Sequence, residues 1–101
     1  MNLDRLTERI KQVSDLYAAD FEIERDDDWY VFKLQEELGE LTQKYLMMTG
    51  RARTKGLSKA DIAVQFRDEV ADTFSLIVLL ARHFDIDLDD AVKDKWLKHL
   101  E

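Results

Sequence analysis

Four acidic residues, arranged as two pairs, are the side chains of this sequence best suited to chemistry. Each pair has i,i+3 spacing within a stretch whose apolar residues recur with helical periodicity. On an ideal helical wheel with Leu34 at zero, the first pair falls at roughly 300° and 240°. With Phe66 at zero, the second pair falls at roughly the same two angles. The pairs are Glu37 with Glu40, and Glu69 with Asp72.

Two helices that pack through these apolar stripes would bring the four carboxylates to one edge of their interface. Like charges one turn apart repel by a few tenths of a kcal/mol even when they are exposed. Partial burial also favours the protonated form of each carboxyl group unless a cation compensates the charge. Oxygen ligands suit hard divalent cations. The spacing therefore predicts a site for Mg²⁺, with Mn²⁺ as the alternative ion.

The composition indicates the kind of fold that positions these residues. Of the 101 residues, 46% are hydrophobic and 37% are charged, and the chain has no proline and only three glycines. Together with long periodic segments, this composition is typical of an all-helical domain. We therefore predict an all-α, four-helix bundle-like fold that forms a single domain over residues 1–101.

Apolar periodicity and capping residues predict where the four helices lie. The first covers residues 3–19, and the second begins at about Trp29, after the aspartates of residues 26–28, and stops at Gly50. Ser58 and Asp61 resemble a weak capping box at the start of the third helix, which continues to about Phe84. The pattern leaves open a break at residues 62–65. The fourth helix is expected at residues 88–100.

The third helix is apolar on more than one side, which predicts that it is long, apolar and buried on several faces. In a chain of this length, the additional cover is expected to come from another subunit. We predict a homo-oligomer, either a dimer or a tetramer, with this helix at the interface. The apolar residues are Phe74, Leu76, Ile77, Val78, Leu79, Leu80 and Ala81.

Charge and composition argue against several classes of partner. A formal net charge of −7 does not suit a protein that binds nucleic acid polymers, because such proteins present a basic face. Cysteine is absent, which excludes thiolate metal sites and is compatible with a reducing compartment. The N-terminal segment lacks the apolar core of a signal peptide, and no apolar run approaches the length of a membrane span. We expect a cytoplasmic protein that does not enter a membrane.

Three motifs together resemble a known family. The segment KLQEELGEL at residues 33–41, EVAD at residues 69–72 and AVKDK at residues 91–95 are similar to the all-α nucleoside triphosphate pyrophosphohydrolases, in particular the MazG-like branch. The resemblance covers residues 29–98. It implies Mg²⁺-dependent hydrolysis between the α and β phosphates of a nucleotide, giving a monophosphate and pyrophosphate. The substrate would be a (d)NTP or a modified nucleotide removed from the cellular pool. The implied Mg²⁺ ligands are Glu37, Glu40, Glu69 and Asp72.

Other side chains are candidates for positioning the substrate. Glu36 lies beside Glu40 on the wheel and either orients a metal ligand or accepts the proton of the attacking water. Trp29 either stacks on a base or packs in the core. Basic side chains are candidates for binding phosphate oxygens, although exposed lysines and residues that favour a helix dipole explain them as well. These basic residues are Lys33, Lys95, Arg51, Arg53 and Lys55.

Two alternatives to this enzyme remain at the level of sequence. Phosphoribosyl-ATP pyrophosphohydrolase of histidine biosynthesis shares the helical fold and the carboxylate arrangement, although the KLQEELGEL context fits the MazG-like branch better. A non-catalytic helical module that uses its acidic edge for protein contacts is the alternative from another class.

Overall fold

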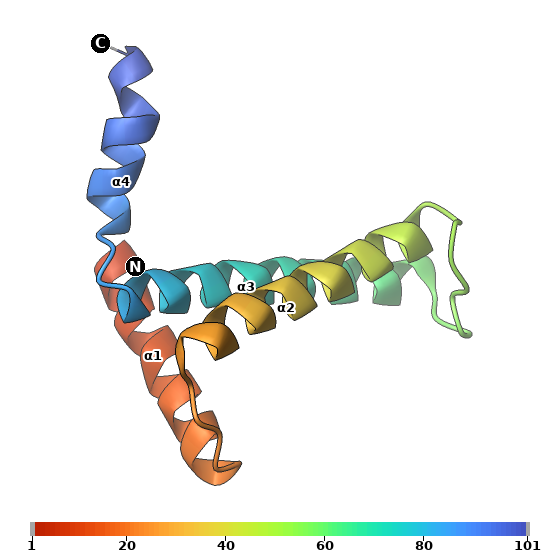
Figure 1. Cartoon of the computed structure of the whole chain (residues 1–101). Coiled ribbons are helices and arrows are strands. Elements are labelled where there is room, and N and C mark those ends of the chain that lie inside the picture. The colour runs from red at the N-terminus through yellow and green to blue at the C-terminus, as the bar shows by residue number, and fades with distance from the viewer. Residues whose placement is uncertain (1, 101) are drawn as a thin grey trace.

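The computed structural model describes residues 2–100, and within that range the protein is entirely helical, with no strand (Figure 1). This confirms the all-α prediction. Four α-helices follow one another along the chain, and a short 3₁₀ helix comes after the last of them. The elements are α1 (Leu3–Asp20), α2 (Asp27–Met48), α3 (Lys59–His83), α4 (Leu88–Lys95) and η1 (Leu97–Leu100).

Helices α2 and α3 form a long antiparallel hairpin, and their packing is the most extensive in the chain (Figure 1). Helix α1 crosses one end of this hairpin and packs against α3. Helix α4 extends away from the other three helices, and none of its residues is buried. The acidic pairs singled out in the sequence therefore lie in the part of the fold that α1, α2 and α3 form together.

Capping residues explain the boundaries of the hairpin. The Asp26 side chain accepts a hydrogen bond of 2.8 Å from the Trp29 amide, so α2 begins two residues earlier than we predicted. Ser58 and Asp61 form the predicted capping box, which opens α3. At the other end of α2, Gly50 adopts φ +74°, which glycine reaches without steric cost and which the chain needs to leave the helix.

Two of our helix boundaries in the second half of the chain are wrong. The break considered at residues 62–65 does not occur, because Ile62 is 3% exposed and anchors the first turns of a continuous α3. The last helix is shorter than predicted, since α4 ends at Lys95 and the chain continues as η1. A short amphipathic helix that packs against little has few interactions to extend it.

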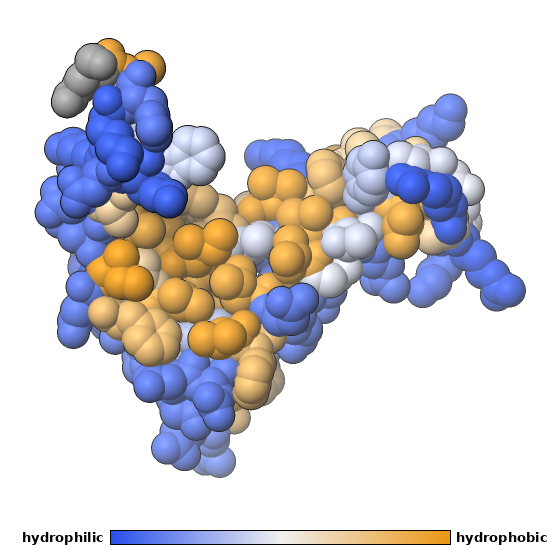
Figure 2. All heavy atoms as spheres, turned by 45° about the horizontal axis from the view of Figure 1, so that its top comes forward, coloured by the Kyte–Doolittle hydropathy of each residue, from blue (hydrophilic) through white to orange (hydrophobic). Residues whose placement is uncertain are grey.

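The helical rotation of the hairpin differs from the one that the apolar stripes predict. Stripe residues Leu38, Tyr45 and Val70 are between 43% and 46% exposed, whereas Glu37 is only 9% exposed. The contact between α2 and α3 therefore runs closer to the carboxylates, and part of each apolar stripe faces outward. Figure 2 shows a broad apolar surface where α4 leaves the rest of the molecule.

Candidate functional site

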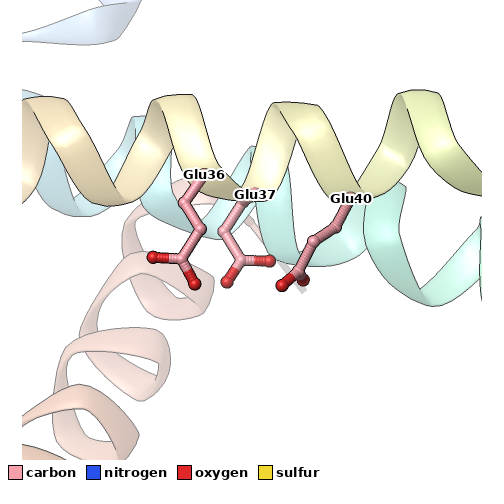
Figure 3. A group of neighbouring side chains, drawn as sticks. All are labelled: Glu36, Glu37 and Glu40. Carbon is pink, nitrogen blue, oxygen red and sulfur yellow. The ribbon is translucent and has the colours of Figure 1, made fainter.

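The four predicted carboxylates come together where α2 packs against α3. Oxygen atoms of Glu37, Glu69 and Asp72 lie within 4.8 Å of one another. A second group with the same spacing consists of Glu36, Glu37 and Glu40, which extend from α2 in one direction (Figure 3). Glu37 belongs to both groups and is the centre of the cluster.

Two carboxylate oxygens in this cluster are buried and have no hydrogen-bond partner among residues 2–100. They are Oε2 of Glu37, from α2, and Oε2 of Glu69, from α3. Buried polar atoms in folded proteins nearly always have a partner, and leaving a charged one unpaired is costly. A cation held by the carboxylates of the cluster would compensate the charge that is buried with these oxygens.

The environment makes these carboxyl groups harder to ionise. Burial, together with the charges of Glu40 and Asp72, raises the pKa of Glu37 to about 7. Burial and the same two neighbours raise the pKa of Glu69, and burial followed by the charge of Asp68 raises that of Asp72. A bound divalent cation would reverse this tendency, because it favours the ionised forms.

Among the basic residues that we predicted to bind phosphate, Lys33 lies next to the cluster. Its Nζ atom is 3.2 Å from Glu36 Oε1 and 3.8 Å from Glu37 Oε1. Burial lowers the pKa of Lys33, but the hydrogen bond to Glu36 and the nearby carboxylates outweigh this and raise it overall. Lys33 therefore stays charged at the mouth of the acidic cluster, where it compensates only part of the negative charge.

A cavity of about 460 Å³ opens beside the carboxylates, between α1 and the α2–α3 hairpin. Lys33, Glu37 and Asp72 line its charged end, and Trp29 forms part of its wall. The rest of the lining is mostly apolar or aromatic. It consists of Ile10, Val13, Ser14, Tyr17, Ser75, Leu76 and Leu79. The volume falls in the range of small-molecule sites.

The basic loop after α2 lies apart from this site. Arg51 donates a hydrogen bond of 2.9 Å from Nε to Thr49 Oγ1, and its guanidinium lies 5.4 Å from the centre of the Tyr45 ring. Arg53 and Lys55 line a different hollow, at the far end of the hairpin. The end of α2 is roughly 12 Å along the helix axis from the nearest carboxylate. The structure therefore does not bring these three residues to the cluster.

Lys95 is the other predicted phosphate-binding residue that the structure does not bring to the cluster. It is the last residue of α4, which extends away from α2 and α3, and it does not line the cavity (Figure 1). Of the five basic residues that we predicted to bind phosphate, Lys33 is therefore the one that lies beside the carboxylates of the same chain.

Sequence reasoning missed the contribution of α1 to the site. Ile10, Val13, Ser14 and Tyr17 share one side of α1 and line the cavity. Their i, i+3, i+4, i+7 spacing could have indicated that this side of α1 faces the rest of the protein. The serine within this otherwise apolar stripe could have indicated a polar contact there. The position of Arg25, which reaches Ser14 from the loop after α1, had no comparable signal in the sequence.

No family model matches the chain, and neither does any curated protein or solved structure. The resemblance to MazG-like pyrophosphohydrolases therefore rests on the sequence motifs, and the chemical case rests on the geometry of the cluster and cavity. None of the helices in residues 2–100 combines the length and apolarity that crossing a bilayer requires.

Proposed function

We propose that this protein is a Mg²⁺-dependent nucleotide pyrophosphohydrolase that cleaves (d)NTPs or modified nucleotides between the α and β phosphates. The observation that carries the proposal is the pair of unpartnered, buried oxygens on Glu37 and Glu69. They come from different helices and lie in a cluster with Asp72. A solvated helix face or a simple surface for protein contacts gives no reason to bury carboxylates in this way.

The residues present fit a hard divalent cation, because every donor in the cluster is a carboxylate oxygen. Glu37, Glu40, Glu69 and Asp72 would hold Mg²⁺, or Mn²⁺ in its place. When bound, the ion would neutralise phosphate charge and make a water molecule more acidic. Lys33 would bind a phosphate oxygen, and the exposed Glu36 would accept a proton from the attacking water.

The cavity supports a substrate with a charged end and a flat, mostly apolar end. Its charged end coincides with the carboxylates, so phosphates held there would place the nucleoside against α1. Trp29 and Tyr17 offer aromatic surface for a base in that position. A nucleotide satisfies both requirements, whereas a free phosphate or pyrophosphate would leave the apolar part of the cavity unused.

Incubation with a panel of nucleotides tests this proposal directly. We expect pyrophosphate and a nucleoside monophosphate to appear with at least one (d)NTP in the presence of Mg²⁺ or Mn²⁺, and neither to appear with EDTA. Chromatography of the nucleotide products, with separate assays of pyrophosphate and orthophosphate, measures the outcome. Orthophosphate release would contradict α–β cleavage. Stabilisation by metal without any release would favour phosphoribosyl-ATP as the substrate.

We also propose that the protein is a homo-oligomer. A compact monomer of 11.9 kDa exposes roughly 6,000 Å², whereas this chain exposes 7888 Å². Its radius of gyration is 16.2 Å, against about 13 Å for a compact domain of this length. Val70, Phe74 and Ile77 are spaced along one side of α3 and remain more than 40% exposed. Contact between copies through this side would cover them.

Replacing Ile77 by aspartate is expected to shift the oligomer toward monomer, because it places a charge in the proposed contact. Sedimentation equilibrium measures the mass, and circular dichroism checks that helical content is retained. Val64→Asp is the matched control, since Val64 is 53% exposed but lies on another side of the same helix. A monomeric wild-type protein at 100 µM would contradict the proposal whatever the variants do.

A further inference from the structure

Ser14 is the polar residue among the side chains of α1 that line the cavity; the other serine of the lining, Ser75, comes from α3. Ile10, Val13 and Tyr17 lie four residues before, one before and three after Ser14, and all of them line the same cavity. A serine at a core-facing position of a helix commonly turns its hydroxyl group to the carbonyl one turn earlier. Ser14 makes no such bond in residues 2–100, although Thr7 and Thr42 do.

The Ser14 hydroxyl is instead fixed by Arg25. Arg25 Nη1 donates a hydrogen bond of 2.8 Å to Ser14 Oγ, and Nη2 donates one of 2.9 Å to Asp15 Oδ1. Lys11 Nζ donates to the other oxygen of Asp15 at 2.6 Å. Hydrogen bonds from Lys11 and Arg25 lower the pKa of Asp15, so the carboxylate stays ionised and holds the guanidinium in place.

The hydrogen bond from Arg25 makes the Ser14 hydroxyl group a hydrogen-bond donor toward any further partner. A hydroxyl group has one hydrogen to donate and two lone pairs, and the guanidinium, which can only donate, occupies one lone pair. The positive charge makes Oγ a weaker acceptor for a second donor and its O–H a stronger donor. Within the described chain the hydroxyl hydrogen has no acceptor, so it is available to a ligand in the cavity.

We propose that Ser14, polarised by Arg25, selects bases that present a keto oxygen over bases that present an amino group at the same position. The inference rests on the proposed function, because it takes the cavity as the place of the nucleoside. A keto oxygen would accept the serine hydrogen, whereas an amino group would bring a donor to an oxygen that already accepts from a cation. Uracil and hypoxanthine would therefore bind better than cytosine and adenine.

Binding of nucleoside monophosphates to the full chain tests this inference without requiring turnover. Trp29 lines the cavity, and Trp96→Phe removes the only other tryptophan, so the fluorescence of Trp29 reports binding. We expect dUMP to bind about five- to tenfold more tightly than dCMP, and dIMP more tightly than dAMP by a similar factor. In Ser14→Ala both ratios are expected to fall close to one.

Two further variants separate polarity from packing. Ser14→Thr keeps the hydroxyl group and is expected to keep the preference for keto bases. Arg25→Met removes the positive charge but not the hydroxyl group, and is expected to lower the preference while circular dichroism shows an intact fold. A role of Ser14 in packing alone would leave the ratio of affinities unchanged.

Unchanged ratios in Ser14→Ala, or no change in Trp29 fluorescence with any of the four monophosphates, would overturn the inference. The release of pyrophosphate from (d)NTPs, measured on the same preparations, reports separately on the proposed function. Release of pyrophosphate without a preference for keto bases would support the proposed hydrolase function and contradict the role of Ser14. Keto-selective binding without release would support the role of Ser14 and contradict the hydrolysis.

Discussion

Replacing Glu69 by glutamine is expected to lower kcat for α–β hydrolysis by at least about 10²–10³-fold. Glu69 contributes one of the two buried carboxylate oxygens that have no partner. Glutamine keeps the size of the side chain but removes its charge and replaces one of its two carboxylate oxygens, which can bind a cation, with an NH₂ group, which cannot. The loss should appear in kcat and in the concentration of Mg²⁺ needed for half-maximal activity, measured by titrating the metal at saturating nucleotide.

Asp68→Asn is the matched control for this substitution. Asp68 precedes Glu69 on α3, is exposed and does not belong to either carboxylate group, so it acts on the cluster only through its charge, which raises the pKa of Asp72. Its loss is expected to change kcat by no more than about threefold, because an exposed charge is largely screened by solvent. Equal losses in both variants would mean that general negative charge, and not a metal site, supports the reaction.

The same pair of variants distinguishes an enzyme from a non-catalytic helical module. A metal site predicts that Mg²⁺ raises the Tm of the wild-type protein and of Asp68→Asn, and raises that of Glu69→Gln much less. A surface used only for protein contacts predicts no response of Tm to Mg²⁺ in any of the three proteins. Differential scanning fluorimetry with Mg²⁺ and with EDTA measures this difference.

Local signals in the sequence were sufficient for much of the helical hairpin. Ser58 and Asp61 opened α3 where predicted, and Gly50 follows the end of α2 with the positive φ that such a position requires. The start of α2 was less certain because three consecutive aspartates can all cap a helix. Asp26 takes the cap, which leaves Asp27 and Asp28 in the first turn, where the helix dipole favours negative charge.

The composition of the acidic cluster was predictable, but its surroundings were not. Periodicity placed Glu37 and Glu69 on corresponding sides of two helices, and the structure brings their oxygens together. A wheel carries no information about how one helix rotates against another, so it did not predict that Glu37 is buried while Leu38 is half-exposed. The cavity depends on where α1 crosses the hairpin, which is likewise a property of tertiary packing.

Replacing Glu37 by glutamine is expected to stabilise the metal-free protein at pH 8. The pKa of Glu37 is about 7 in the folded chain, against an ordinary value of 4.5. Between these two pH values the folded state binds more protons than the unfolded state, so the free energy of unfolding falls as the pH rises from about 4.5 to 7. A shift of this size corresponds to about 3 kcal/mol, and glutamine removes the charge that causes it.

Thermal unfolding in EDTA measures this effect. At pH 8 the Tm of Glu37→Gln is expected to exceed that of the wild-type protein by on the order of 10 °C. At pH 4.5 to 5 the difference should nearly vanish, because Glu37 is then protonated in the wild-type protein. Asp94→Asn is the control, since Asp94 is an exposed acid on α4, and its Tm should follow that of the wild-type protein at both pH values.

Addition of Mg²⁺ at pH 8 should reverse the order of the two proteins. The cation would stabilise the ionised Glu37 of the wild-type protein and release its remaining proton, whereas the glutamine variant lacks the central carboxylate of both groups. The variant that is more stable without metal would then be the less stable one with it. If Glu37→Gln instead lowers the Tm at pH 8 in EDTA, the carboxylate makes a favourable contact in the metal-free fold. The negative charge at this point would then stabilise the hairpin, and a cation would not be needed to explain its burial.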